Sequence, residues 1–223
     1  MNLVLLGPPG AGKGTQAALL AREYRIPKIS TGEMLRDLTE RGDEAGRQIA
    51  ALIDRGEMVP DETVQALVWE RLRQPDAQAG FLLDGFPRTV SQAEALDQFL
   101  AEQGRAVTGV LDIEVPEEEL IRRLSGRRVC PVCGASYHLD SHPPQVPDRC
   151  DREGAVLEQR PDDRPEAIKV RLGLYHQRTR PVLDYYRARG LLQRIEGDRT
   201  MREVTEQIQQ ALERSRPPEG LAR

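Results

Sequence analysis

The chain has 223 residues, of which 39% are hydrophobic and 30% are charged, and its formal net charge is -4. No apolar run approaches the roughly 20 residues that a membrane-spanning helix needs, so we expect no membrane partner. The negative charge argues against a nucleic-acid partner bound mainly through phosphate neutralisation. We therefore expect a soluble globular protein in which any anion site is local.

The first residues and the cysteines both predict a cytoplasmic protein. Residues 1–7 lack the basic start, long apolar stretch and small-residue cleavage site of a secretory signal. The chain has three cysteines, an odd number that fits reduced thiols or a metal site better than a disulfide framework. No apolar patch can be identified from the sequence, so we expect a monomer.

Short apolar runs alternate with helical patterns along most of the chain. The first run, Leu3–Leu6, precedes a glycine-rich loop and a helical stretch at 16–21, which predicts a strand, a turn and a helix. Four further runs predict strands at 28–30, 81–84, 110–113 and 191–195. This alternation predicts an α/β fold with a doubly wound, parallel five-stranded sheet.

Two stretches interrupt the alternation and divide the chain. Residues 31–59 carry helical patterns without a strand, which predicts an inserted helical module. Residues 127–163 are rich in Pro, Gly, Asp and Cys, which predicts a small β-rich lid. We expect the core to comprise 1–30, 60–126 and 164–214, and we expect residues 215–223, with two prolines and few apolar groups, to form a frayed tail.

The glycine-rich segment Gly7–Thr15 has the context of a phosphate-binding P-loop, because it follows a predicted strand and opens a predicted helix. Its backbone N–H groups and the helix N-terminus favour an anion, and Lys13 can reach terminal phosphates. The strict pattern has Ser or Thr directly after the lysine, whereas here one glycine intervenes. The alternative is a glycine turn that only tightens packing. The predicted ATP-binding residues of the loop are Gly10, Ala11, Gly12, Lys13, Gly14 and Thr15.

A second candidate segment, Asp84–Arg88, ends the third predicted strand. In an open α/β sheet, ligands bind beyond the carboxyl ends of the strands. Asp84 can organise Mg²⁺ through water, and Arg88 can clamp a transferring phosphoryl group. The alternative is a strand-ending turn with a surface arginine.

The cysteines have the spacing of a zinc ribbon. Cys130 and Cys133 form one C-x-x-C pair, and Cys150 begins a second pair whose other member is Glu153. Four protein ligands leave no open position, so the predicted zinc is structural. His138 and His142 are alternative fourth ligands, and three thiols without metal are the remaining alternative.

The motifs together resemble those of the bacterial adenylate kinases over nearly the whole chain. The resemblance rests on four segments, 7–15, 30–36, 84–88 and 159–163. It implies Mg²⁺-dependent conversion of ATP and AMP to two ADP, on a core that carries an AMP-binding helical insert and a mobile lid. Members with a metal in the lid use cysteine or aspartate where this chain has Glu153.

The resemblance also implies roles for individual residues. The AMP-binding residues would be Thr31, Arg36, Glu57, Met58, Val59, Gly85, Phe86, Pro87, Arg88, Gln92, Arg160 and Arg171. The ATP-binding residues outside the loop would be Arg127, Ser136, Tyr137 and Arg199. The residues that stabilise the phosphoryl group in transfer would be Lys13, Arg88, Arg127, Arg160 and Arg171.

Two rival functions remain open at this point. One is a kinase of the same class that prefers GTP as donor or another monophosphate as acceptor. The other is a P-loop module that binds ATP without phosphoryl transfer and uses the cysteine segment as an interaction surface. Trp69 and His176 are expected to be a packing residue and a surface residue.

Overall fold

The computed structural model describes residues 1–214; the predicted tail at 215–223 lies outside them. In this part of the chain, the main sheet has five parallel strands in the order β2-β3-β1-β4-β7. The alternating pattern therefore predicted the α/β fold class correctly. The last strand begins one residue later than predicted. The bounds are β1 (Asn2–Leu6), β2 (Lys28–Ser30), β3 (Phe81–Asp84), β4 (Gly109–Glu114) and β7 (Leu192–Glu196).

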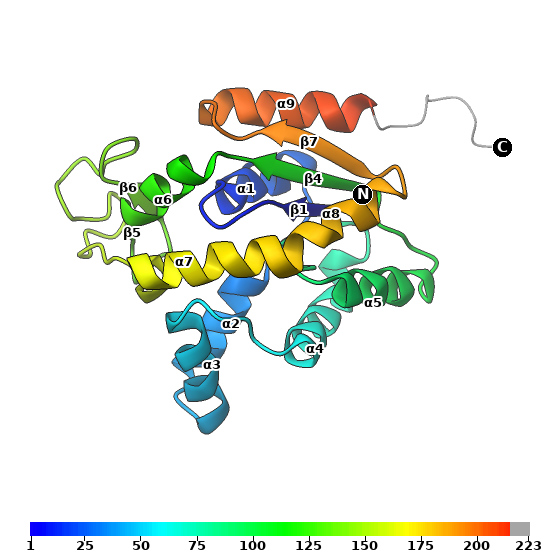
Figure 1. The fold of residues 1–223 in the computed structure, drawn as a ribbon, viewed down its shortest axis with the longest axis horizontal. Coiled ribbons are helices and arrows are strands. Elements are labelled where there is room, and N and C mark those ends of the chain that lie inside the picture. The colour runs from blue at the N-terminus through cyan, green and yellow to red at the C-terminus, as the bar shows by residue number, and fades with distance from the viewer. Residues whose placement is uncertain (215–223) are drawn as a thin grey trace.

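Helices cover both faces of the sheet (Figure 1). Because successive strand residues point to opposite faces, Leu3 and Leu5 pack with one group of helices, and Val4 and Leu6 pack with the other. The first group comprises α1 (Lys13–Tyr24), α6 (Glu117–Ser125), α7 (Pro165–Leu174) and α9 (Met201–Arg214). The second group includes α4 (Asp61–Leu72), α5 (Val90–Ala101) and α8 (Arg180–Arg187).

Two helices, α2 (Thr31–Glu40) and α3 (Glu44–Asp54), project from the sheet between β2 and α4 (Figure 1). Both begin at a side-chain cap. The Ser30 hydroxyl accepts from the Glu33 N–H at 3.4 Å, and the Asp43 carboxylate accepts from the Gly46 N–H at 2.7 Å. Such caps satisfy helix N–H groups that lack a partner within the helix.

A small lobe lies at the opposite end of α6 from β4 (Figure 1). It contains β5 (Arg127–Val129) and β6 (Ser136–His138), which pair antiparallel, and further bridges such as Arg149 with Val156. Its small core consists of Cys130, Tyr137, Cys150 and Leu157.

Three short helical segments connect the larger elements. The 3-10 segment η1 (Pro75–Ala77) lies between α4 and β3, and η2 (Pro161–Asp163) precedes α7. A π-helical segment, η3 (Tyr175–Thr179), joins α7 to α8.

Among the helices of residues 1–214, none has both the length and the apolar character that crossing a bilayer requires.

Candidate active site

The glycine-rich loop connects β1 to the start of α1. Gly10 and Gly12 have φ angles of +86° and +90°, which side-chain-bearing residues rarely adopt. Gly7, at φ +138°, passes so close to β4 that an added Cβ would lie 2.6 Å from the Ile113 carbonyl oxygen. These constraints explain why the loop has glycine at these positions. The loop leads directly into the N-terminus of α1, where a bound anion is favoured.

Lys13 is the first residue of α1, and its ammonium group lies against the loop. The Nζ atom donates to the carbonyl oxygens of Gly7 and Pro8 at 2.7 and 2.8 Å. Burial lowers the pKa of Lys13 to about 8; Asp84 opposes this shift, and the nearby arginines, Arg88 among them, add to it. The loop is therefore a region of concentrated positive charge, which suits a polyanion.

The carboxyl end of β3 lies beside this loop. Asp84 is buried, and its Oδ2 would lie 3.6 Å from a Cβ added at Gly14, so the bare backbone there leaves room next to the carboxylate. The Gly85 carbonyl oxygen accepts from the Thr31 hydroxyl at 3.0 Å and from Arg88 Nε at 2.8 Å. Thr31, the first residue of α2, is thereby joined to the strand end.

A cleft opens between the loop, the strand end and α7. Its lining includes these predicted residues: Lys13, Met58, Gly85, Pro87, Arg88 and Arg171. Val59 and Phe86 are buried and adjoin lining residues in the sequence. The Glu57 carboxylate, in contrast, is paired with Arg55 at 2.9 Å near the surface. The cleft thus brings together residues from both predicted subsites.

Three arginines and two aspartates form one network of ion pairs, and one of these arginines, Arg171, also lines the cleft. Arg127 donates through Nε and Nη2 to Asp163 at 2.7 and 2.6 Å, and Arg171 contacts the same carboxylate at 3.1 Å. Arg171 also pairs with Asp162 at 3.0 Å, and Arg160 lies 3.4 Å from it. Burial alone would raise the pKa of Asp162, but the positive charge of these groups and of Arg36 outweighs it and lowers that pKa.

The predicted residue Arg36 interacts electrostatically with this network, namely with Arg160 and Asp162. It lies on α2, half-buried, and burial followed by the charge of Arg160 lowers its pKa to about 10. Arginine side chains from segments far apart in the sequence, such as Arg36 and Arg160, therefore lie in one region near the cleft. No role was predicted for Asp162 and Asp163, although both stand in the segment 159–163 that carries the resemblance.

Gln92, at the start of α5, is almost completely buried. Its Oε1 accepts from the Arg88 N–H at 2.7 Å, and its Nε2 donates to Asp61 Oδ1 at 2.8 Å. Asp61 could not be predicted from the sequence, because it lies 31 positions from Gln92 and no local pattern relates the two residues.

Three predicted donor-site residues lie away from the cleft. Ser136 is exposed on β6, and Arg199 is exposed and paired with Glu196 at 2.9 Å. Tyr137 is buried in the small lobe, where its hydroxyl lies 3.5 Å from Cys150 Sγ and accepts from the Asp151 N–H at 2.9 Å. Trp69 stacks on Phe99 with ring centroids 4.3 Å apart, which is the packing role predicted for it.

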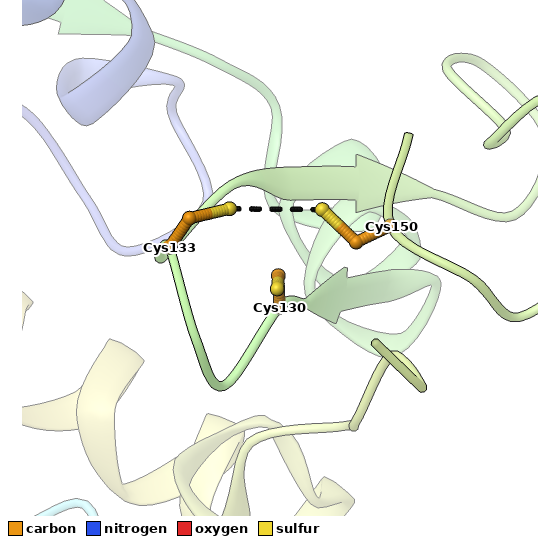
Figure 2. A group of neighbouring side chains, drawn as sticks. All are labelled: Cys130, Cys133 and Cys150. Atoms are coloured by element: carbon orange, nitrogen blue, oxygen red, sulfur yellow. Dashed lines mark hydrogen bonds between the residues drawn. The ribbon is translucent and has the colours of Figure 1, made fainter. Parts of the chain in front are cut away.

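The three cysteines converge in the small lobe (Figure 2). Their sulfur atoms all lie within 4.8 Å of one another, and the sulfurs of Cys133 and Cys150 are 3.6 Å apart. This donor set fits a thiophilic metal such as zinc. Within residues 1–214, the group comprises the cysteines alone; Glu153, the fourth ligand that the spacing predicted, is exposed and stands outside it.

The two alternative histidine ligands have other partners. His138 Nδ1 accepts from the N–H groups of Asp140 and Ser141 at 3.1 and 3.2 Å, and its Nε2 lies 3.3 Å from the Arg122 carbonyl oxygen. His142 stacks on Tyr137. His176, expected at the surface, lies 3.3 Å from Glu117 with its side chain half exposed.

A P-loop at the end of β1, an Asp-Gly-Phe-Pro-Arg turn at the end of β3 and an arginine cluster facing both define a nucleotide-binding phosphotransferase. Residues 5–191 match the family model described as adenylate kinase. Proteins named adenylate kinase from Moorella thermoacetica and Archaeoglobus fulgidus are 52% and 48% identical to this chain, each over 96% of it and 99% of the relative. A third, from Symbiobacterium thermophilum, is 50% identical over 97% of the chain and 100% of the relative.

The chain belongs to the adenylate kinase family. It is a nucleoside monophosphate kinase, which transfers a phosphoryl group reversibly between ATP and AMP to give two ADP and uses Mg²⁺ with ATP. The resemblance drawn from the sequence motifs is thereby confirmed, and the rival binding module without phosphoryl transfer is not supported.

Proposed function

We propose that the cleft holds both nucleotides of the adenylate kinase reaction, with the phosphoryl group passing between Lys13 and the arginine cluster. The single observation that carries this proposal is convergence: Lys13, Arg88 and Arg171 line one cleft, and Arg127 shares the Asp163 carboxylate with Arg171. Asp84, Asp162 and Asp163 balance part of this positive charge. The phosphates of the two nucleotides would interact with the remaining positive charge.

On the donor side, we propose that the loop residues 10–15 bind the ATP phosphates through backbone N–H groups and Lys13. Mg²⁺ bound with ATP would neutralise phosphate charge, and we assign its water shell to Asp84, whose carboxylate lies beside the bare backbone of Gly14. We assign Arg127, Ser136, Tyr137 and Arg199 to the same nucleotide. Because Ser136 is exposed on β6 of the small lobe, its contact with ATP requires this lobe to move toward the core.

On the acceptor side, we propose that AMP lies between α2 and the end of β3. Arg36 and Arg88 neutralise its phosphate, and Gln92 recognises the adenine edge. Arg160 and Arg171 contact phosphates of both nucleotides. We assign the remaining contacts to residues around the cleft: Thr31, Glu57, Met58, Val59, Gly85, Phe86 and Pro87.

The reaction then needs no covalent intermediate. Positioning of the two phosphates in line and neutralisation of the charge on the transferring group account for catalysis. We propose that 31–59 and 127–163 move as an AMP-binding insert and a lid against the core of 1–30, 60–126 and 164–214. Their closure excludes water, which would otherwise accept the phosphoryl group.

Arg36→Ala tests the division into two subsites. We expect the variant to weaken AMP binding about 30-fold, the effect of losing a charge-assisted contact, and to change ATP binding less than about twofold. Isothermal titration with each nucleotide separately measures both constants. Arg47→Ala is the matched control, because Arg47 lies on α3, exposed and paired with Glu44. Equal loss of ATP and AMP binding, or no loss of AMP binding, contradicts the assignment.

We further propose that the small lobe binds one structural zinc ion through Cys130, Cys133 and Cys150. The mutual proximity of their sulfur atoms supports this proposal. Glu153 follows Cys150 by three residues, and a rotation of its exposed side chain is the most direct way to supply a fourth ligand. All ligands come from the lobe, so the metal stabilises its fold and does not contact phosphate.

Cys130→Ser is expected to remove the zinc and lower the thermal transition of the lobe, while turnover below that transition stays within about twofold of the unmodified chain. Metal analysis of the purified protein and scanning calorimetry are the measurements. Val132→Ser is the control, because this exposed residue lies between the two cysteines of the first pair. A Cys130→Ser protein that retains its zinc, or that loses turnover while folded, contradicts a structural metal.

We also propose that the enzyme works as a monomer in the cytoplasm. Each subsite is built from residues of one chain, so the proposed site needs no partner copy. The three cysteines are free thiols in the structure, which suits a reducing compartment.

A further inference from the structure

The side-chain amide of Gln92 is held in one orientation by its neighbours. Its two partners differ in kind: the Arg88 backbone N–H at 2.7 Å can only donate, and the Asp61 carboxylate at 2.8 Å can only accept. The oxygen of the amide must therefore face Arg88, and the nitrogen must face Asp61. A 180° flip would place donor against donor and acceptor against acceptor.

Asp61 is itself fixed in place. It stands at the first position of α4, and its other oxygen, Oδ2, accepts from the hydroxyls of Thr89 and Ser91 at 2.8 and 3.0 Å. Thr89 in turn caps α5 by accepting from the Gln92 N–H at 3.2 Å. The carboxylate thus joins the starts of two helices, and its position relative to the Gln92 amide is determined by both.

We propose that Asp61 is a positioning residue that sets the base selectivity of the acceptor site by fixing the orientation of the Gln92 amide. The inference rests on the proposed contact between Gln92 and the acceptor base. Among the described residues, the amide makes one hydrogen bond through each of its polar atoms, so one Nε2–H and one Oε1 lone pair remain for a ligand.

The fixed orientation matters because adenine and guanine present opposite patterns to an amide. The Watson–Crick edge of adenine carries an acceptor ring nitrogen beside a donor amino group, whereas the same edge of guanine carries a donor ring nitrogen beside an acceptor carbonyl. An amide that can rotate could serve either base. An amide that is held pairs with one pattern and leaves unpaired groups against the other, which is how a polar site rejects a close analogue.

The test is a double-mutant cycle on acceptor choice. Asp61→Ala, Gln92→Ala and the double variant are assayed with saturating ATP for kcat/KM with AMP and with GMP. We expect Asp61→Ala to reduce the AMP-to-GMP ratio about tenfold, mainly through a higher KM for AMP, with the KM for ATP unchanged. Because Asp61 acts through Gln92, the double variant should have the ratio of Gln92→Ala alone.

Two further variants separate positioning from general stability. Glu62→Ala removes an exposed carboxylate from the same first turn of α4 and should leave the ratio unchanged. If Asp61→Ala does not fold, Asp61→Ser replaces it, since a serine hydroxyl favours a helix start but is too short to hold the amide. Circular dichroism at the assay temperature establishes that each variant assayed is folded.

The outcomes distinguish the inference from the proposed site. If Gln92→Ala leaves the ratio unchanged, the proposed contact with the base is wrong, and the inference falls with it. If Gln92→Ala lowers the ratio and Asp61→Ala does not, the inference alone is overturned. Additive effects in the double variant, or an equal effect of Glu62→Ala, also overturn it.

Discussion

Lys13→Ala is expected to lower kcat for ADP formation about 10³-fold, because it removes a preorganised cation from the position where phosphoryl charge develops. The native ammonium lies against the loop carbonyls of Gly7 and Pro8. From there its flexible side chain can reach a phosphate bound in the loop. A coupled assay of ADP formation with saturating ATP, AMP and Mg²⁺ measures the effect.

The fold should survive this change. Removing the half-buried Lys13 cation relieves its desolvation cost and its repulsion from Arg88 and other arginines, but it also removes its attraction to Asp84. These effects oppose one another, so we expect the melting temperature of Lys13→Ala to stay within about 5 °C of that of the unmodified chain. Lys169→Ala is the matched control, since Lys169 is an exposed lysine on α7. Residual activity above about a tenth of the original would contradict the central role of Lys13.

Asp163→Ala is expected to lower the free energy of unfolding by about 3 kcal/mol, because it leaves two partly buried guanidinium groups without their carboxylate. The Asp163 side chain has no exposed surface, and it holds Arg127 by two hydrogen bonds and Arg171 by a third. Urea unfolding followed by circular dichroism measures the change.

An exposed ion pair gives the comparison for this effect. Asp184 pairs with Arg187 on the surface of α8, with both side chains more than half exposed. Asp184→Ala should therefore cost less than about 1 kcal/mol. If the two aspartate variants unfold at similar urea concentrations, the buried network does not stabilise the fold as we describe.

The elements that could be predicted from the sequence are those with a local cause. The strands at 3–6, 81–84 and 110–113 appear in the sequence as mainly apolar runs. Helices cover both faces of the sheet, so most positions in these strands favour an apolar residue. Three glycines of the loop could be predicted for a similar reason, because the φ angles of Gly7, Gly10 and Gly12 are ones that residues with a Cβ atom rarely adopt.

The contacts that could not be predicted join residues far apart in the chain. The pair of Gln92 with Asp61 spans 31 positions, and Arg127 reaches Asp163 across 36. No periodicity or spacing encodes such pairs. The roles of the arginines came from the resemblance to adenylate kinases, since an isolated arginine is usually a surface charge.

The metal site could be predicted from the sequence only in part. Spacing predicted correctly that Cys130, Cys133 and Cys150 gather, because a C-x-x-C turn brings two thiols to one side. Spacing also marked position 153, but it could not tell whether a glutamate there turns toward the sulfurs or toward solvent. In the structure the Glu153 side chain is exposed.

The proposed site is tested most directly by ADP formation from ATP and Mg²⁺ with AMP, GMP, CMP and UMP offered separately, and with Lys13→Ala as the blank. We expect turnover with AMP to exceed turnover with each of the other monophosphates about 10²-fold or more. Preference for another monophosphate, or an absence of acceptor-dependent turnover above the blank, would contradict the proposed site.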